Sequence, residues 1–281
     1  MAQRKAHQKP KGLSALGLSI VTIAIWALYM FPVVWLVVSS LKTRVDVFAV
    51  PPKLWFVPTL QNYLEKFTEA RFLLSLRNSL FTTILTVVVS LTVGSLAAYA
   101  FARFRFRGSR LLSFSLIGIQ MMPGMVFVAP IFEMMDKLHL RNTFAGIVLV
   151  FVTFQIAFTV WMLRSFFEEV PRETEEAAWI DGASRLQTFV HVILPLAAPG
   201  MAAAAVFSAN GAWNAFLFAM LIGGAETMTL QVYLAGHVML REVQWTGIMA
   251  TGTLTLVPPV VFAMLVQRNF IRGLTLGAVK G

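Results

Sequence analysis

Residues 168–195 read EEVPRETEEAAWIDGASRLQTFVHVILP and lie between two strongly apolar parts of the chain. Pro171 suits the first turn of a helix, where its missing N–H is not needed. The acidic residues that follow it stabilise a helix N-terminus, because they interact with the positive end of the helix dipole. Gly182 is typical of the left-handed position that ends a helix. The first half of this stretch therefore predicts a short helix outside the membrane that ends in a tight turn.

The second half of the stretch predicts another short helix. Ser184 followed by Gln187 matches a capping box, in which the side chain of each residue bonds the backbone N–H of the other. We expect this helix to run to about Val192. Pro195 and Pro199 are then expected to close the segment before the next apolar stretch.

The composition places this segment in a membrane protein. Hydrophobic residues make up 58% of the chain and charged residues 13%, whereas a soluble domain has about 45–50% and about 25%. Since a membrane helix needs about 20 mostly apolar residues, we predict an all-α, polytopic integral membrane protein with six transmembrane helices. The expected spans are Leu13–Leu41, Ser79–Ala102, Leu111–Phe132, Phe144–Leu163, Gly200–Ile222 and Gly247–Val266.

Basic residues near the span ends predict the orientation. The formal net charge is +10, but the basic residues flank the spans instead of forming one stripe, which argues against nucleic acid as a partner. With the N-terminus inside, most of them are cytoplasmic, and so are both termini. The first outside loop is also basic and opposes this orientation, although Asp46, Glu65 and Glu69 dilute its charge. The residues expected inside are Arg4, Lys5, Lys9, Lys11, Arg103, Arg105, Arg107, Arg110, Arg268, Arg272 and Lys280.

We expect one membrane domain over residues 13–271, between cytoplasmic tails at 1–12 and 272–281, with the polar segment in an inside loop at 164–199. The first outside loop contains several prolines that disfavour helix, followed by a polar and apolar stretch at 60–76 that predicts a helix along the membrane surface. This loop is either a simple connector or a landing surface for a partner outside the cell.

The inside loop carries a spaced motif. Glu176-Ala177-Ala178, Gly182 and Val192-Ile193-Leu194-Pro195 match the pattern E-A-A-x3-G-x9-I-x-L-P, with Val192 at the Ile position. On these residues the chain resembles the permease subunits of binding-protein-dependent ABC importers. Further stretches make it similar to the carbohydrate branch, and there to the maltose-type second permease subunit. They are residues 51–58, Asn62-Tyr63, Asn78-Ser79, Trp213-Asn214 and residues 273–281.

The resemblance implies the type I ABC importer permease fold in the inner (cytoplasmic) membrane of a bacterial cell. It also implies that the first short helix is a coupling helix, which docks on a separate ATPase and transmits its movement. An amphipathic loop helix without a partner is the alternative. The residues implied in ATPase coupling are Glu175, Glu176, Ala177, Ala178, Asp181, Gly182, Leu194 and Pro195.

The resemblance further implies a homologous second permease, an ATPase dimer and an extracytoplasmic solute-binding protein, which the outside segment 226–241 is expected to contact. The chain has no G-x-x-x-x-G-K-[ST] phosphate loop, so we expect ATP and Mg to bind to the ATPase and no cofactor in this chain. Its histidines are dispersed and it has no cysteine. We therefore expect no metal site and no catalytic residues.

Polar residues inside the expected spans are candidates for a substrate pathway, because such residues usually face a cavity or another helix. Asn210, Trp213 and Asn214 fall at i, i+3 and i+4 and so on one helical face. Amides and an indole suit the hydroxyls and ring of a sugar. Gln120 and Gln155 are expected to line the same path. Hydrogen bonding between helices is the alternative role for these side chains.

We therefore expect a permease subunit that moves a sugar or oligosaccharide into the cell. The same machinery would also suit a solute such as glycerol phosphate. An ion-coupled secondary carrier belongs to a different class and would normally show acidic residues within its spans. The expected spans of this chain are almost free of Asp and Glu.

Overall fold

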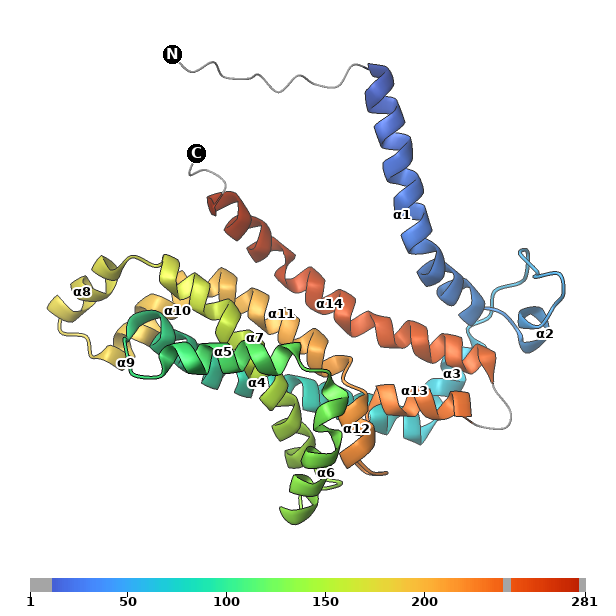
Figure 1. Cartoon of the computed structure of the whole chain (residues 1–281). Coiled ribbons are helices and arrows are strands. Elements are labelled where there is room, and N and C mark those ends of the chain that lie inside the picture. Colours follow the sequence, from blue (N-terminus) through green and yellow to red (C-terminus); the bar gives the residue numbers. More distant parts are fainter. Residues whose placement is uncertain (1–11, 240–243, 278–281) are drawn as a thin grey trace. The chain divides into compact units, whose positions relative to one another are not determined.

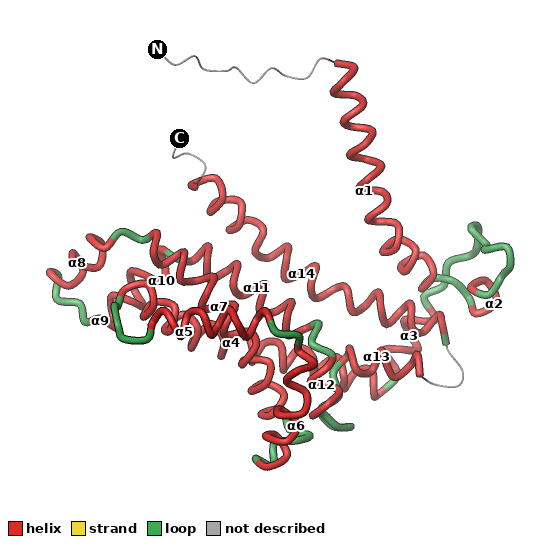
Figure 2. The backbone as a smooth tube through the Cα atoms, in the orientation of Figure 1, coloured by secondary structure: helices red, strands yellow, loops and turns green. Residues whose placement is uncertain are grey.

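The computed structural model describes residues 12–239 and 244–277 (Figure 1), and within these ranges all regular structure is helical, as Figure 2 shows. The predicted all-α class is confirmed. The expected basic residues of the N-terminal tail, and the last residues of the C-terminal tail from 278, lie outside the described ranges. The helices are α1 Gly12–Ser40, α2 Arg44–Val47, α3 Gln61–Thr68, α4 Ala70–Arg103, α5 Ser109–Met121, η1 Gly124–Phe127, α6 Val128–Lys137, α7 Phe144–Glu169, α8 Arg172–Ile180, α9 Arg185–Thr188, η2 Phe189–Ile193, α10 Leu194–Leu196, α11 Ala198–Trp213, α12 Leu217–Ile222, α13 Leu230–Met239 and α14 Trp245–Gly277.

Four of these helices, α1, α4, α7 and α14, are long and apolar enough to cross a membrane, and the number rises to six if each of two bent pairs is one span. The first pair, 109–121 with 124–137, bends by 103°. Pro123 lies at that bend, where its missing N–H interrupts the helical hydrogen bonds. The second pair, 185–196 with 198–213, bends by 80°. The six predicted spans equal the larger number, but the second pair includes residues 185–196, which the sequence predicts to lie in the inside loop, and it ends before the predicted end of the fifth span at Ile222.

Several predicted boundaries differ from the structure, since α4 begins before the expected Ser79 and α7 and α14 end beyond the expected Leu163 and Val266. The expected surface helix over 60–76 ends at Thr68, and the rest of that stretch belongs to the first turns of the long α4. The fifth expected span, 200–222, is interrupted after Trp213, where Asn214 caps α11 and its side chain donates a hydrogen bond to the backbone oxygen of Asn210, 2.9 Å away. An Asn side chain that bonds nearby backbone competes with helix continuation.

The chain divides into two compact units, one of which comprises residues up to 66 together with 244–253. In this unit the Asn62 amide donates to the carbonyls of Ser40 at 2.7 Å and Lys42 at 2.9 Å, so it caps the end of α1. The Lys53 ammonium, 2.6 Å from the Asp46 carboxylate, holds the pKa of Asp46 below its usual value. The most apolar window of α1 has no buried residue, as expected of a helix that faces lipid or another subunit.

The second unit, residues 67–243 and 254 onward, contains the packed core. Helices α4, α7 and α11 lie against one another and α5 packs on α7. Figure 1 shows α8 and α9 at one end of these helices, and α6 and α12 at the other. Gly94 on α4 permits close approach to α7, because a Cβ there would lie 2.7 Å from Thr159 Cγ2. This unit positions both candidate sites described below.

Candidate functional site

The first candidate site is the coupling segment, which we define as residues 171–196. It begins with α8, whose end is marked by Gly182 with φ of +87°. The predicted capping box is present, since the Ser184 backbone N–H donates to Gln187 Oε1 at 2.8 Å and the Gln187 N–H donates to Ser184 Oγ at 3.4 Å. The two short helices and the turn are therefore confirmed.

The second helix of the coupling segment is longer than predicted. It continues beyond Val192 through a π-helical turn at 189–193 and then through α10 to Leu196, so Pro195 lies inside a continuous helical stretch and does not close it. The proline ring would clash with the carbonyl four residues earlier in a regular α-helix, and the wider π turn gives it room. The bend falls instead at Ala197, just before α11 and Pro199.

Helix α8 has a solvent-exposed face. Glu176 and Ala177 are exposed and Ala178 is half-buried, while Ile180 keeps 86% of its surface exposed. Beyond the turn Leu186 is 67% exposed. Exposed large apolar side chains in a polar segment are typical of a protein–protein contact surface. Of the remaining residues implied in coupling, Asp181, Gly182 and Pro195 are exposed and Leu194 packs partly against the core.

Glu175 lies on the opposite face of α8 and is buried. It forms an ion pair with Arg103, the last residue of α4, and the two side chains are 4% and 7% exposed. Its other oxygen accepts a hydrogen bond from the Tyr99 hydroxyl at 2.7 Å, and Arg103 also donates to the Val170 carbonyl at 2.8 Å. The structure therefore places Glu175 inside the chain, away from the exposed face that includes Glu176.

Aromatic packing surrounds this ion pair. The Tyr99 ring lies 5.0 Å from the Phe189 ring and 6.1 Å from the Phe167 ring, measured between centroids. Arg185 lies over the rings of Phe104 at 5.5 Å and Trp179 at 5.7 Å. The end of α4, the end of α7 and both halves of the coupling segment thus form one packed cluster.

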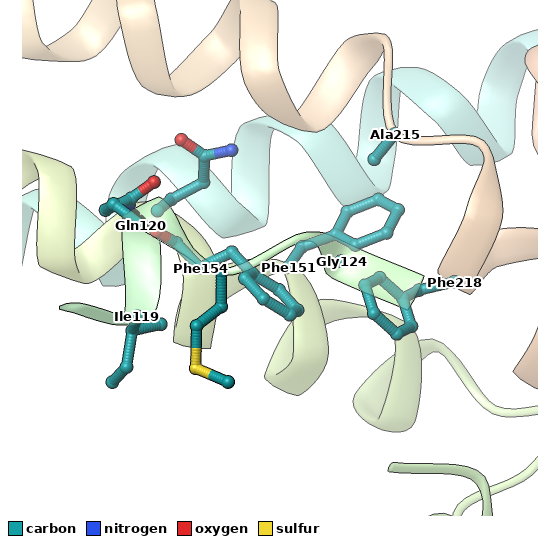
Figure 3. Close-up of a pocket in the computed structure, with 9 residues that line it drawn as sticks. Ile119, Gln120, Gly124, Phe151, Phe154, Ala215 and Phe218 are labelled. Carbon is teal, nitrogen blue, oxygen red and sulfur yellow. Dashed lines mark hydrogen bonds between the residues drawn. The ribbon is translucent and has the colours of Figure 1, made fainter. Parts of the chain in front are cut away.

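The second candidate site is a cavity of about 190 Å³, lined by residues from the bend after α5, the middle of α7 and the start of α12 (Figure 3). Gln120 and Gln155 both line it, so the structure brings these two predicted pathway residues together. Gln120 donates to the Phe154 carbonyl at 2.7 Å, and the Phe154 and Phe218 rings stack at 4.9 Å. The full lining is Ile119, Gln120, Met122, Gly124, Phe151, Phe154, Gln155, Ala215 and Phe218.

The other predicted pathway residues lie elsewhere. Trp213 is 2% exposed, and its indole N–H donates to the Thr255 carbonyl at 3.1 Å. Asn210 and Asn214 are exposed and bonded to each other, with 2.9 Å between the Asn214 Nδ2 and the Asn210 Oδ1. None of the three lines the cavity. Sequence reasoning missed the aromatic residues of the cavity, because phenylalanine in a span has no polar signal.

No group of three or more His, Cys, Asp and Glu side chains capable of holding a metal ion is found in the described ranges.

The chain is similar in sequence to known proteins. Residues 90–276 match a family model described as "Binding-protein-dependent transport system inner membrane component". A probable ABC transporter permease protein of Sinorhizobium fredii is 35% identical, over 90% of this chain and 91% of that protein. A trehalose/maltose transport system permease protein of Thermococcus litoralis is 33% identical over 90% and 92%. A trehalose transport system permease protein of Mycobacterium tuberculosis is 35% identical over 90% and 93%.

The fold is also similar to solved structures. A bacterial ABC transporter involved in the import of the acidic polysaccharide alginate matches with a TM-score of 0.81 and 24% identity, covering 95% of this chain and 100% of that one. The same kind of transporter in complex with a periplasmic protein bound to an alginate pentasaccharide matches with a TM-score of 0.65 and 15% identity, over 90% and 92%. At these identities the likeness shows the fold alone.

Proposed function

This chain belongs to the family of binding-protein-dependent transport system inner membrane components, and on that premise we propose that it is the permease subunit through which an ATP-driven importer moves a sugar or oligosaccharide into the cell. The observation that carries the proposal is the coupling segment, with its spaced motif and the exposed Ile180 beside Glu176. The names of the relatives, which include permeases for trehalose and maltose, support a sugar as the cargo.

The proposed partners follow from what the chain lacks and exposes. Because it has no phosphate loop, a separate ATPase dimer binds ATP and Mg and seats the exposed face of α8 in a surface cleft. A homologous second permease covers the apolar face of α1 and completes the pathway. An extracytoplasmic solute-binding protein delivers the cargo. Both termini are cytoplasmic in this arrangement, on the same side as the coupling segment.

The proposed cargo contact is the cavity lined by Gln120 and Gln155. Two amides can bond sugar hydroxyls, and the phenylalanine rings provide flat apolar surface for a sugar ring. None of the lining residues is charged, so the cavity suits a neutral sugar better than glycerol phosphate, whose anion would require basic groups. It also lacks the acidic residue that an ion-coupled carrier would use.

The function is tested by uptake into vesicles that contain the complete complex and its binding protein. The ATPase faces the interior of these vesicles, which also contains ATP. Labelled trehalose, maltose and glycerol phosphate are each added separately to the outside. We expect ATP-dependent uptake of a neutral sugar and none of glycerol phosphate. Uptake of glycerol phosphate with no sugar uptake would contradict the sugar assignment and leave the importer assignment intact.

Replacing Gln155 by leucine tests the cavity itself. The change removes hydrogen bonds to the sugar at nearly constant volume, and a neutral hydrogen bond contributes about 0.5–1.5 kcal/mol. We therefore expect the concentration of sugar-loaded binding protein needed for half-maximal uptake to rise about fivefold. Thr153→Val is the matched control, because Thr153 is on the same helix, is exposed and bonds its own backbone. Equal uptake curves for Gln155→Leu and the control would remove the cavity from the pathway.

A further inference from the structure

Helix α4 is held at both ends by buried polar contacts that join it to two segments with different proposed partners. At its C-terminal end is the inner anchor, which we define as Tyr99, Arg103 and Glu175. Both oxygens of Glu175 are used, one by Arg103 and one by Tyr99. Arg103 also bonds the Val170 carbonyl at the end of α7. The coupling segment therefore cannot shift relative to the end of α4 without breaking a buried charged contact.

The N-terminal part of α4 holds the outer anchor, which we define as Asn78, Ser79 and the backbone of residues 226–230. Asn78 is fully buried, and its amide donates to the carbonyls of Glu226 at 2.8 Å and Met228 at 3.0 Å. Ser79 Oγ accepts a hydrogen bond from the backbone N–H of Leu230 at 2.7 Å. A single turn of α4 thus fixes the loop between α12 and α13.

That loop is itself internally bonded. Thr227 Oγ1 accepts from the Gly224 N–H at 3.0 Å and donates to Asn142 Oδ1 at 3.1 Å. Thr227 is 3% exposed. The loop is therefore a fixed part of the outer face. A displacement of its backbone would move the carbonyls that the Asn78 amide bonds.

Between the two anchors α4 is one uninterrupted helix without proline. From Asn78 to Tyr99 it spans about 32 Å at 1.5 Å per residue. It packs against α7 and α11. Since interfaces of this kind shift as rigid bodies between discrete arrangements, displacement of one anchor is transmitted to the other.

We propose that α4 is the element that couples the ATPase side to the binding-protein side, with Glu175, Arg103 and Asn78 as positioning residues. Glu175 acts within this chain, as the link between α8 and α4, while the exposed face of α8 meets the ATPase. The inference rests on the proposed function, because it needs an ATPase at the coupling segment and a solute-binding protein at the outer loop.

The test uses the complete complex in vesicles and compares its ATPase rate with and without sugar-loaded binding protein. The readout is the ratio of the two rates, because a loss of folded complex lowers both rates and leaves their ratio unchanged. We expect Glu175→Gln and Asn78→Ala each to lower this ratio about tenfold, within the usual range of coupling between sites. Glu169→Gln is the control. Glu169 is the last residue of α7, its carboxylate is exposed, and it does not belong to the inner anchor.

The double variant separates one shared element from two independent effects. Sites this far apart are ordinarily additive, so two independent effects would multiply and bring the ratio further toward one, the value without stimulation. If both anchors act through α4, breaking either one already disconnects the two sides, and the double variant is no worse than the worse single variant. A multiplicative loss overturns the proposal.

The remaining outcomes are also decisive. If the wild-type complex shows no stimulation by any sugar-loaded binding protein, the proposed function fails. If the wild type is stimulated and Glu175→Gln keeps the full ratio, only the role of α4 is overturned. Should Glu175→Gln prevent assembly, Asn78→Ala alone carries the test, because its contacts are neutral and lie away from the ion pair. A lowered ratio in that variant supports the proposal and an unchanged ratio overturns it.

Discussion

Replacing Gly94 by leucine is expected to leave little folded protein in the membrane. A Cβ at this position would lie 2.7 Å from Thr159 Cγ2 and 3.1 Å from Thr159 Cβ. Thr159 is fully buried and β-branched, and its hydroxyl bonds the Gln155 carbonyl at 2.9 Å, so it cannot turn aside. The leucine would force α4 and α7 apart at the centre of the core.

The expected cost is at the upper end of the range for overpacking, about 3 kcal/mol, which lowers the ratio of folded to unfolded protein on the order of a hundredfold. Thermal unfolding and the yield of monodisperse protein in detergent measure it. Gly118→Leu is the matched control, because a Cβ built there meets no atom within 4 Å apart from its chain neighbours and the backbone of its own helix. Equal stability of the two variants would show that α4 and α7 do not approach as closely as described.

Replacing Gly182 by leucine is expected to lower ATP-driven uptake about tenfold without loss of the membrane fold. No atom lies within 4 Å of a Cβ at Gly182, so the substitution creates no clash. Its cost is the left-handed backbone conformation at φ of +87°, about 1–2 kcal/mol for a residue with a side chain. The turn between α8 and α9 is then misplaced, and the ATPase seats the coupling segment poorly.

Asn is the informative control at this position, because it tolerates the left-handed conformation better than other non-glycine residues. We expect Gly182→Asn to retain most of the uptake and most of the copurified ATPase, and Gly182→Leu to lose both. If both variants behave like the wild type, the turn does not determine docking. If both variants lose uptake and ATPase binding equally, no side chain is tolerated at this position, and backbone strain does not explain the loss.

Local signals explain why the coupling segment was predictable. The capping box of Ser184 and Gln187, and the turn at Gly182, depend on residues a few positions apart, so their geometry can be read from spacing. The π turn before Pro195 was not predicted, because a proline within a helix allows several local adjustments that spacing does not distinguish.

Tertiary pairing explains what the sequence did not reveal. Glu175 and Arg103 come from distant parts of the chain, and the position of Arg103 at a span end indicates only the orientation of that span. Helical spacing placed Trp213 on one face with two asparagines, but it does not say which side of the helix faces the core. The structure buries Trp213 and ends α11 there. Of the residues that line the cavity, the sequence identifies the two glutamines and none of the aromatic residues.

We propose that transport through this permease is driven by ATP hydrolysis in another polypeptide. The most direct measurement is sugar uptake by cells or vesicles that contain the wild-type permease. In one experiment the ATPase carries a substitution of its phosphate-loop lysine. In the other an ionophore collapses the proton gradient while ATP is maintained. We expect the ATPase variant to abolish uptake and the ionophore to leave it unchanged. Uptake that continues with the inactive ATPase and stops with the ionophore would contradict it.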